Sequence, residues 1–318
     1  MSDINIAYSC DDHYVEQTGI SIISLLENNR EVDSICIYLI SKNISNTNIQ
    51  TLSDLISVYN RTLVVVNFDD ICYDLDISSI GRHIETIYSK VFFSRIKDLE
   101  KILYIDSDTI VARNLDSLWN IDLEDVYMGV IETTSTQFKK QLGMPDNALF
   151  FNDGLALINV DYCRRNDLIN KIKQVIKEYD GNPPLLSEGA LNKVCVGKVK
   201  YISLRYNLMS GILYGCLHDL DYMSACLHYT KEDLIDSCKN PVVIHYLSAY
   251  YNRPWCKGCT HPLKDYYIKY KHLSPWKDTP LVHKPLSFKL RLFNYCIRIM
   301  GYRFFHKIRS CGNLIIRK

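Results

Sequence analysis

Short apolar runs alternate with longer stretches of helical periodicity along the first third of the chain. Runs typical of strands cover residues 4–9, 34–40, 62–68 and 102–105. Between them, apolar residues recur at helical spacing over residues 15–29, 49–59 and 84–96. Strands separated by helices predict an α/β fold with a mostly parallel central sheet flanked by helices. Ligands of such sheets bind beyond the carboxyl ends of the strands, so residues that directly follow strands are the first candidates for chemistry.

The second half of the chain continues this pattern and then loses it. We predict strands at 128–131, 149–160 and 242–244, and helices near 162–179 and 185–195. Beyond about residue 257 the chain becomes aromatic and is interrupted by prolines. We therefore expect a main domain over residues 1–256 and a C-terminal extension over residues 257–318, which ends in a basic helical appendage.

Charge changes the picture of that extension. The 318 residues carry a net charge of +1, but residues 279–318 hold nine Lys or Arg and no acidic residue. Bulky apolar residues stand between these charges in FKLRLFNYCIRIMGYRFFHKIRS, a composition that argues against a nucleic-acid arm. A basic amphipathic segment on an anionic membrane surface fits better. The alternative is a terminal helix packed on the body with its basic residues in water.

The remaining composition indicates an intracellular protein. Apolar residues make up 47% of the chain, enough for a sizeable core, yet no stretch free of charge reaches the ~20 residues of a membrane-spanning helix. The first residues lack a basic region followed by an apolar run, and twelve scattered cysteines are typical of reduced thiols. The Cys256–Cys259 pair has no second pair at zinc-site spacing. We expect a cytoplasmic location, peripheral on the inner face of the cell membrane.

Candidate metal ligands follow the predicted strand at 102–105. The Asp-x-Asp pattern occurs three times, but only Asp106-Ser107-Asp108 directly follows a buried strand. Two carboxylates fixed at a strand break can converge on one cation, and His245 follows another strand. Hard oxygen ligands suit Mg²⁺ or Mn²⁺, and an imidazole favours Mn²⁺. The alternative is a capped turn before residues 114–119.

Five segments, in order, resemble the motifs of glycosyltransferase family 8. They read IAYSCDDHY, IYSKVFFSRI, ILYIDSDTIVARNLDSLWNIDL, FFNDGLALINV and IHYLSAYYNRPW, and the resemblance covers roughly residues 4 to 256. It implies a glycosyltransferase A fold and a retaining hexosyltransferase that moves galactose or glucose from a UDP-sugar with the help of a divalent metal. The acceptor implied is a glycan or lipid-linked glycan of bacterial surface polysaccharide, capsule or lipopolysaccharide.

The resemblance also implies roles for particular residues. The implied metal ligands are Asp106, Asp108 and His245. The implied nucleotide contacts are Ser9, Asp11, His13, Ser107 and Ser248, where Ser248 replaces a glycine of the family. Lys90 replaces an arginine that touches diphosphate and sugar, and Arg253 replaces a lysine that holds the β-phosphate. Asn152 is expected to contact the sugar near its reacting centre.

Glu188 departs from the family pattern in a way that affects the mechanism. It occupies the position of a glutamine, and the aspartates usual on either side are Ser187 and Gly189. A glutamate can act as a nucleophile in a double displacement. It can also stabilise positive charge on the sugar during front-side transfer, or serve only as an acid at a helix N-terminus. Glu132 stands where the family places an acid facing the acceptor, or it is a strand-end residue on the surface.

Two other functions remain open on the sequence alone. A sugar nucleotidyltransferase is also α/β and metal-dependent, but it needs a glycine-rich loop after the first strand, where this chain is acidic. A carbohydrate-binding protein that has lost catalysis would bind a nucleotide sugar without turnover. For the transferase, loops near 134–148 and 246–254 are expected to close over the donor and keep water from the sugar.

Overall fold

The structure, a computed structural model, describes residues 3–77, 82–248, 250–306 and 308. Residues 307 and 309–318 of the predicted basic segment lie outside the described residues. Among the described residues, no helix has the length and apolar character needed to cross a membrane.

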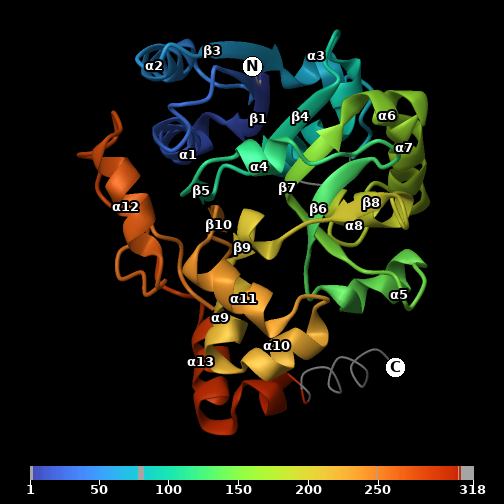
Figure 1. The fold of residues 1–318 in the computed structure, drawn as a ribbon, viewed down its shortest axis with the longest axis vertical. Helices are drawn as coiled ribbons and strands as arrows, with labels where there is room; N and C mark the ends of the chain where they lie inside the picture. The colour runs from blue at the N-terminus through green and yellow to red at the C-terminus, as the bar shows by residue number, and fades with distance from the viewer. Residues whose placement is uncertain (1–2, 78–81, 249, 307, 309–318) are drawn as a thin grey trace.

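A seven-stranded sheet forms the centre of the molecule, in the order β3-β2-β1-β4-β7-β6-β8 (Figure 1). Its strands are β1 (Asp3–Asp11), β2 (Ser34–Lys42), β3 (Thr62–Asn67), β4 (Lys101–Ile105), β6 (Met128–Glu132), β7 (Phe151–Asn159) and β8 (Val199–Tyr201). β7 runs antiparallel to its neighbours β4 and β6, while every other pairing in this sheet is parallel. The predicted mostly parallel sheet is confirmed. Because β7 is reversed, its first residues lie at the same edge as the carboxyl ends of β1, β4 and β6.

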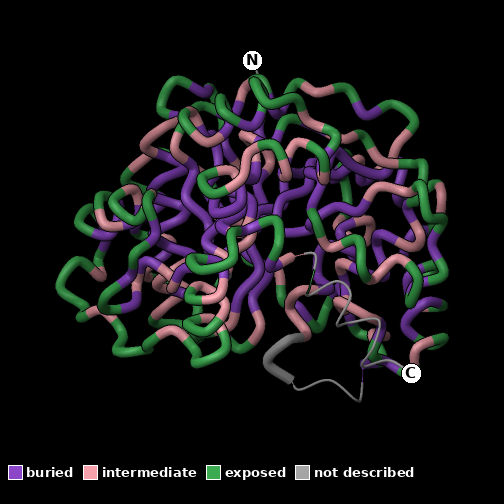
Figure 2. The backbone as a smooth tube through the Cα atoms, turned by 90° about the horizontal axis from the view of Figure 1, so that it is seen from below, coloured by how far each residue is buried: buried purple, intermediate pink, exposed green. Residues whose placement is uncertain are grey.

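Helices cover both faces of this sheet. Successive side chains of a strand point to opposite faces, so the strands contribute apolar residues to two cores, one on each face. In β1, Ile4, Ile6 and Tyr8 enter the core beneath α1 (Val15–Glu27) and α2 (Asn46–Ser57), while Ala7 enters the opposite one. The second core is closed by α3 (Phe68–Cys72), α6 (Val160–Arg165), α7 (Leu168–Glu178), α8 (Ser187–Val194) and the 3₁₀ segment η2 (Arg82–Arg95). Buried backbone fills the centre of the molecule in Figure 2.

Two helix predictions differ from the structure in detail. The helix predicted over 84–96 corresponds to η2, which winds as a 3₁₀ helix and ends at residue 95. Its residues 88–93 are all buried, so this central part has no solvent face. The helix predicted over 162–179 is two helices, α6 and α7, because the chain turns at Asp167, whose φ is 52°. Asp and Asn tolerate this left-handed conformation better than other side chains, which accounts for the break.

A second, three-stranded sheet stands beyond the end of β4. It consists of β5 (Thr109–Val111), β10 (Val243–His245) and β9 (Leu208–Met209) in the order β5-β10-β9. Thr109 pairs with His245, and the Tyr246 amide donates to the Asp108 carbonyl over 2.9 Å. This small sheet therefore brings the end of β10 beside the residues that follow β4.

The remaining helices belong to the lower part of Figure 1 and to short connections. They are α4 (Asp116–Trp119), α5 (Lys139–Leu142), α9 (Ser210–His218), α10 (Leu220–Cys226), α11 (Lys231–Lys239), α12 (Lys264–His272) and α13 (Phe288–Met300), with short 3₁₀ turns η1 (Asp12–Tyr14), η3 (Thr136–Phe138) and η4 (Leu204–Tyr206). α12 packs on α1, where Lys271 forms an ion pair with Glu16. Val282 bonds to the backbone of Trp255 and Lys257. The boundary at residue 256 remains a prediction.

Candidate active site

Asp106, Asp108 and His245 form a cluster that could hold a metal ion. One ligand atom from each lies within 4.8 Å of the others. His245 Nε2 is 2.9 Å from Asp108 Oδ1 and 3.7 Å from Asp106 Oδ2. His245 is completely buried and Asp108 nearly so, whereas Asp106 keeps 29% of its side chain exposed. The cluster is thus a fixed site with one open side.

Three features of the cluster fit a divalent cation. His245 Nε2 is buried and makes no hydrogen bond to the described residues, although two carboxylates lie close to it. Carboxylate oxygens together with an imidazole are a ligand set for Mn²⁺ or Mg²⁺. Gly154 leaves the space open, since a Cβ there would lie 2.3 Å from His245 Cε1 and 2.6 Å from Asp106 Oδ2. The residues present therefore suit the metal that the sequence predicts.

The electrostatics of the cluster favour positive charge between its members. Burial opposes ionisation of Asp108, but His245 and Arg253 hold the pKa of that carboxyl below its ordinary value. Burial also opposes a charge on His245, yet the carboxylates of Asp108 and Asp106 raise the pKa of the imidazole. A site that favours a cation in this way is suited to holding a divalent metal.

Two cationic side chains flank the cluster. Arg253 Nη2 is 3.1 Å from Asp108 Oδ2, and its Nε donates to Ser248 Oγ over 3.0 Å. Lys90 is buried on the other side, with Nζ 3.8 Å from Asp106 Oδ1 and 3.2 Å from Asp153 Oδ2. The structure thus places Lys90, Ser248 and Arg253 around the cluster, and their contacts to a diphosphate stay a prediction.

Asn152 and Glu188 lie next to each other on the sheet side of the cluster. Asn152 Nδ2 donates to Glu188 Oε2 over 2.7 Å, and the Ser187 hydroxyl donates to Asp153 Oδ2 over 2.7 Å. Glu188 and Ser187 therefore turn toward the site rather than toward the amides at the start of α8. Burial, reinforced by the Asp153 carboxylate, raises the pKa of Glu188 to about 8. The Glu188 carboxyl thus has the Asn152 amide and the Asp153 carboxylate near it.

Local backbone geometry explains one departure from the family pattern. Leu185 and Leu186, just before α8, have φ values of 60° and 56°, which are strained for non-glycine residues. The turn brings the Pro184 carbonyl so close to Gly189 that a Cβ there would lie 1.8 Å from it. An aspartate cannot occupy position 189 in this conformation, so the glycine is required by the turn that presents Glu188.

The predicted nucleotide contacts divide into two groups. Ser9 and Ser107 lie together, since the Ser107 hydroxyl donates to the Ser9 carbonyl over 3.4 Å. Asp11 Oδ1 accepts from the His13 amide and caps η1, with His13 exposed. These two residues lie at the rim after β1, and no contact described for them reaches the metal cluster.

Two residues of the site were not predicted from the sequence. Asp153 follows Asn152 in a quoted motif and places a second carboxylate, besides that of Asp106, beside Lys90. Asn207, which is completely buried, stands between His245 and Asn152, and nothing in the pattern around it indicates a role. Glu132 is also different from the expectation of an acid facing an acceptor. It is 3% exposed, and its two oxygens accept from the amide and Nδ1 of His228.

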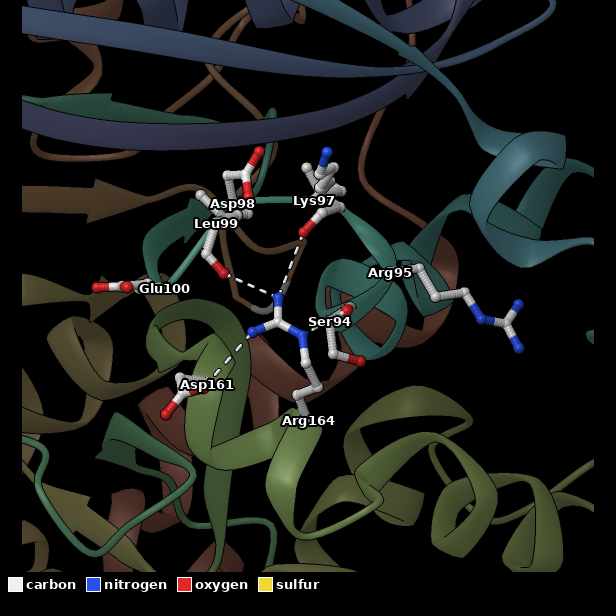
Figure 3. A pocket seen from close by; sticks show the side chains of 9 residues that line it. Ser94, Arg95, Lys97, Asp98, Leu99, Glu100, Asp161 and Arg164 are labelled. Carbon is white, nitrogen blue, oxygen red and sulfur yellow. Dashed lines mark hydrogen bonds and ion pairs between the residues drawn. The ribbon is translucent and has the colours of Figure 1, made fainter.

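A separate cavity of about 460 Å³ lies at the opposite edge of the sheet, near the start of β4 (Figure 3). Arg164 points into it and donates to the carbonyls of Ser94, Ile96 and Leu99. Its guanidinium is thus occupied in closing the loop between η2 and β4. This cavity contains none of the candidate site residues.

Comparison with known proteins agrees with this geometry. The family model of glycosyl transferase family 8 matches residues 5–258. A Haemophilus influenzae protein named as a glycosyltransferase is 28% identical over 269 residues, which cover 81% of this chain and 74% of that protein. The lipopolysaccharide 1,2-glucosyltransferase of Escherichia coli K12 is 23% identical over 284 residues, covering 86% of this chain and 79% of the relative.

Solved structures show the same fold. The galactosyltransferase LgtC, in complex with donor and acceptor sugar analogues, superposes with a TM-score of 0.68 at 22% identity, covering 91% of this chain and 99% of LgtC. The fold is of the glycosyltransferase A type, as the sequence predicts. The chain belongs to glycosyltransferase family 8.

Proposed function

We propose that the protein is a Mn²⁺-dependent, retaining hexosyltransferase that moves galactose or glucose from a UDP-sugar to a glycan. The observation that carries this proposal is the buried Asp106, Asp108 and His245 cluster with Lys90 and Arg253 on its two sides. Cleavage of the bond between the sugar and UDP places negative charge on the diphosphate. A site that concentrates positive charge at this point stabilises the departing group where its charge develops.

Each part of the site has a separate task in this reaction. A bound divalent metal would supply Lewis-acid stabilisation of the diphosphate. Lys90 is buried and fixed by the carbonyl and carboxylate of Asp153, so it approaches the donor without a large reorganisation. Arg253 is held by Ser248 and by the Tyr14 hydroxyl, 2.9 Å from its Nη1. The Arg253 guanidinium is therefore suited to bind a phosphate oxygen on the side of the cluster that it flanks.

Glu188 and Asn152 are proposed to face the transferred sugar. The Asn152 amide orients Glu188 through a hydrogen bond. The pKa of the Glu188 carboxyl is high in the metal-free protein, and positive charge that develops nearby would favour its ionisation. Both a nucleophile and a charge stabiliser need the carboxylate form. If the carboxylate is the nucleophile, Glu188→Gln abolishes transfer, whereas a stabiliser leaves a slow retaining reaction that product NMR detects.

The acceptor is proposed to be a lipid-linked glycan of lipopolysaccharide type or of another bacterial surface polysaccharide. The names of the E. coli relatives support this choice, since several are lipopolysaccharide glucosyltransferases. A binding protein without catalysis is the alternative; the complete ligand cluster and the buried Lys90 support an enzyme instead. A nucleotidyltransferase receives no support, because the loop after β1 presents Asp11 and Asp12 where a triphosphate would need glycines.

We also propose that α13 attaches the enzyme to the inner face of the cell membrane. Phe288, Leu292, Tyr295 and Ile299 follow one another at helical spacing, and all four side chains are exposed. Lys289, Arg291 and Arg298 stand on the same helix, and no acidic residue does. An exposed apolar stripe with basic neighbours fits an anionic lipid surface.

The membrane test must leave the rest of the tail in place. Asn294 donates to the Tyr250 carbonyl, and the Val282 segment pairs with Trp255, so truncation would disturb the loop that carries Arg253. We expect the double variant Phe288→Asp, Ile299→Asp to lose binding to phosphatidylglycerol vesicles and to keep its activity on a soluble acceptor. Val58→Asp, at a site that is 78% exposed elsewhere, is the control. Unchanged vesicle binding would refute the attachment.

The proposed reaction is tested by incubating the protein with a panel of UDP-sugars and Mn²⁺ and measuring UDP release, first without acceptor. We expect slow hydrolysis of one donor that stops with a chelator and in Asp108→Asn. A truncated lipopolysaccharide core should then accelerate release. A protein that binds UDP with Mn²⁺ but turns over no donor, with or without acceptor, would support the binding protein instead.

A further inference from the structure

A continuous line of buried side chains joins the candidate metal ligand His245 to Glu188. His245 Nδ1 lies 3.0 Å from Asn207 Oδ1, and Asn207 Nδ2 lies 2.9 Å from Asn152 Oδ1. Asn152 Nδ2 then donates to Glu188 Oε2 over 2.7 Å. Asn207 is completely buried and Asn152 is 8% exposed. Each contact along the line joins a donor to an acceptor, and Asn152 Oδ1 accepts a second hydrogen bond, from the Gly154 amide.

The direction of this line follows from one backbone amide. The Gly154 N–H can only donate, and it lies 3.1 Å from Asn152 Oδ1, so that atom is an acceptor and the oxygen of the side-chain amide. Asn152 must then turn its NH₂ group to Glu188. Asn207 faces the same oxygen and must present its own NH₂ group there. The Asn207 oxygen is therefore the atom that faces His245.

An amide oxygen accepts and never donates, so His245 Nδ1 must carry a proton. In the neutral imidazole the other nitrogen, Nε2, then holds the free lone pair. Nε2 is the atom that points to Asp106 and Asp108 and makes no hydrogen bond to the described residues. Asn207 thus selects the tautomer in which His245 can bind a metal on the side of the carboxylates.

The backbone fixes Asn207 firmly in this place. Its amide donates to the Leu204 carbonyl over 3.0 Å, and the next two residues form β9. In the small sheet Met209 pairs with His245 itself. The side-chain amide therefore belongs to the residue just before β9 and the imidazole to β10, so the pairing of these two strands sets their separation.

We propose that Asn207 is a positioning residue with two partners: it holds His245 in the metal-binding tautomer and it orients Asn152 against Glu188. The inference deepens the proposed function and rests on it. According to this proposal, the buried Asn207 amide aligns the metal ligand His245 with Asn152 and Glu188, the residues proposed to face the sugar. Partners of this kind behind a metal ligand typically change metal affinity by about 10–100-fold when they are removed.

Two substitutions separate the two contacts. Asn207→Leu removes both, and we expect Mn²⁺ affinity, measured by calorimetry in the presence of UDP, to fall about 10-fold or more. Asn207→Asp keeps an acceptor for His245 Nδ1 but loses the donor to Asn152. We expect it to bind Mn²⁺ within a few-fold of wild type while transfer is strongly reduced. Asn29→Leu, at a buried asparagine away from the site, controls for the loss of an internal amide.

A second readout needs no bound metal and no turnover. In protein labelled with ¹⁵N-histidine, we expect a slowly exchanging Nδ1–H proton on His245 in wild type and in Asn207→Asp, and its loss in Asn207→Leu. Circular dichroism and thermal unfolding show whether each variant is folded. Wild-type Mn²⁺ affinity and a retained Nδ1–H signal in folded Asn207→Leu would overturn the inference. Absence of Mn²⁺ binding in the wild-type protein would instead overturn the proposed metal site.

Discussion

The carboxyl of Glu188 should make the metal-free protein less stable as the pH rises. Burial and the nearby Asp153 carboxylate raise the pKa of Glu188 from 4.5 to about 8 in the folded protein. Between these values the unfolded chain has released a proton that the folded chain still holds. The free energy of unfolding therefore falls with rising pH over this window, and the cost is complete only above about pH 8.

The size of the effect follows from the same two values. Each pKa unit corresponds to about 1.4 kcal/mol, so the interval from 4.5 to about 8 sets a ceiling of about 5 kcal/mol. Glu188→Gln has nearly the same shape, and its amide oxygen can still accept from Asn152. We expect the variant to match wild type near pH 5 and to be more stable than wild type by a few kcal/mol at pH 8.

Urea unfolding with a chelator present, at several pH values from 5 to 8, measures this difference directly. Fluorescence and circular dichroism should give coincident transitions, which licenses a single free energy of unfolding at each pH. A difference between wild type and Glu188→Gln that stays constant across the range would refute the reasoning. The Glu188 carboxyl would then ionise near its ordinary pKa of 4.5, and its surroundings beside Asp153 would have to be solvated.

Three further predictions follow from single contacts. Gly154→Ala should fold but lose Mn²⁺ binding by at least about tenfold in calorimetry, because its Cβ enters the metal cluster; Gly129→Ala, where the nearest atom is 3.4 Å from the added Cβ, should keep it. Arg253→Ala should weaken UDP binding more than Arg253→Lys does; equal losses would contradict a phosphate contact. Hydrogen bonds from Arg95 and Lys173 lower the pKa of Asp74, so wild type should lose its stability advantage over Asp74→Asn as the pH falls below about 4; an advantage independent of pH would refute this.

Much of the site could be predicted because its chemistry lies where strands end. Asp106 and Asp108 directly follow β4, and His245 is the last residue of β10, so a pattern of buried runs with polar ends indicates them. The mostly parallel character of the sheet follows from the alternation of strands and helices, which is a local signal. These parts of the prediction depend only on residues that are close together in the sequence.

What could not be predicted depends on contacts between distant segments. Asn207 lies beside His245 only because the adjoining strand β9 pairs with β10. This pairing involves two residues of each strand, and no local sequence pattern predicts it. Glu132 ends a strand as expected, but His228 covers it from a loop far along the chain. The need for glycine at position 189 becomes clear only from the close approach of the Pro184 carbonyl. Burial of a polar group by a remote segment cannot be read from the residues beside it.

The most direct test of the central claim is anomalous diffraction from crystals grown with Mn²⁺ and UDP. The account predicts one strong Mn²⁺ peak bound by a carboxylate oxygen of Asp106, one of Asp108 and Nε2 of His245, with the UDP diphosphate completing its coordination. Arg253 should lie against the same diphosphate. UDP bound without a metal at these three residues, or Mn²⁺ bound elsewhere on the chain, would contradict it.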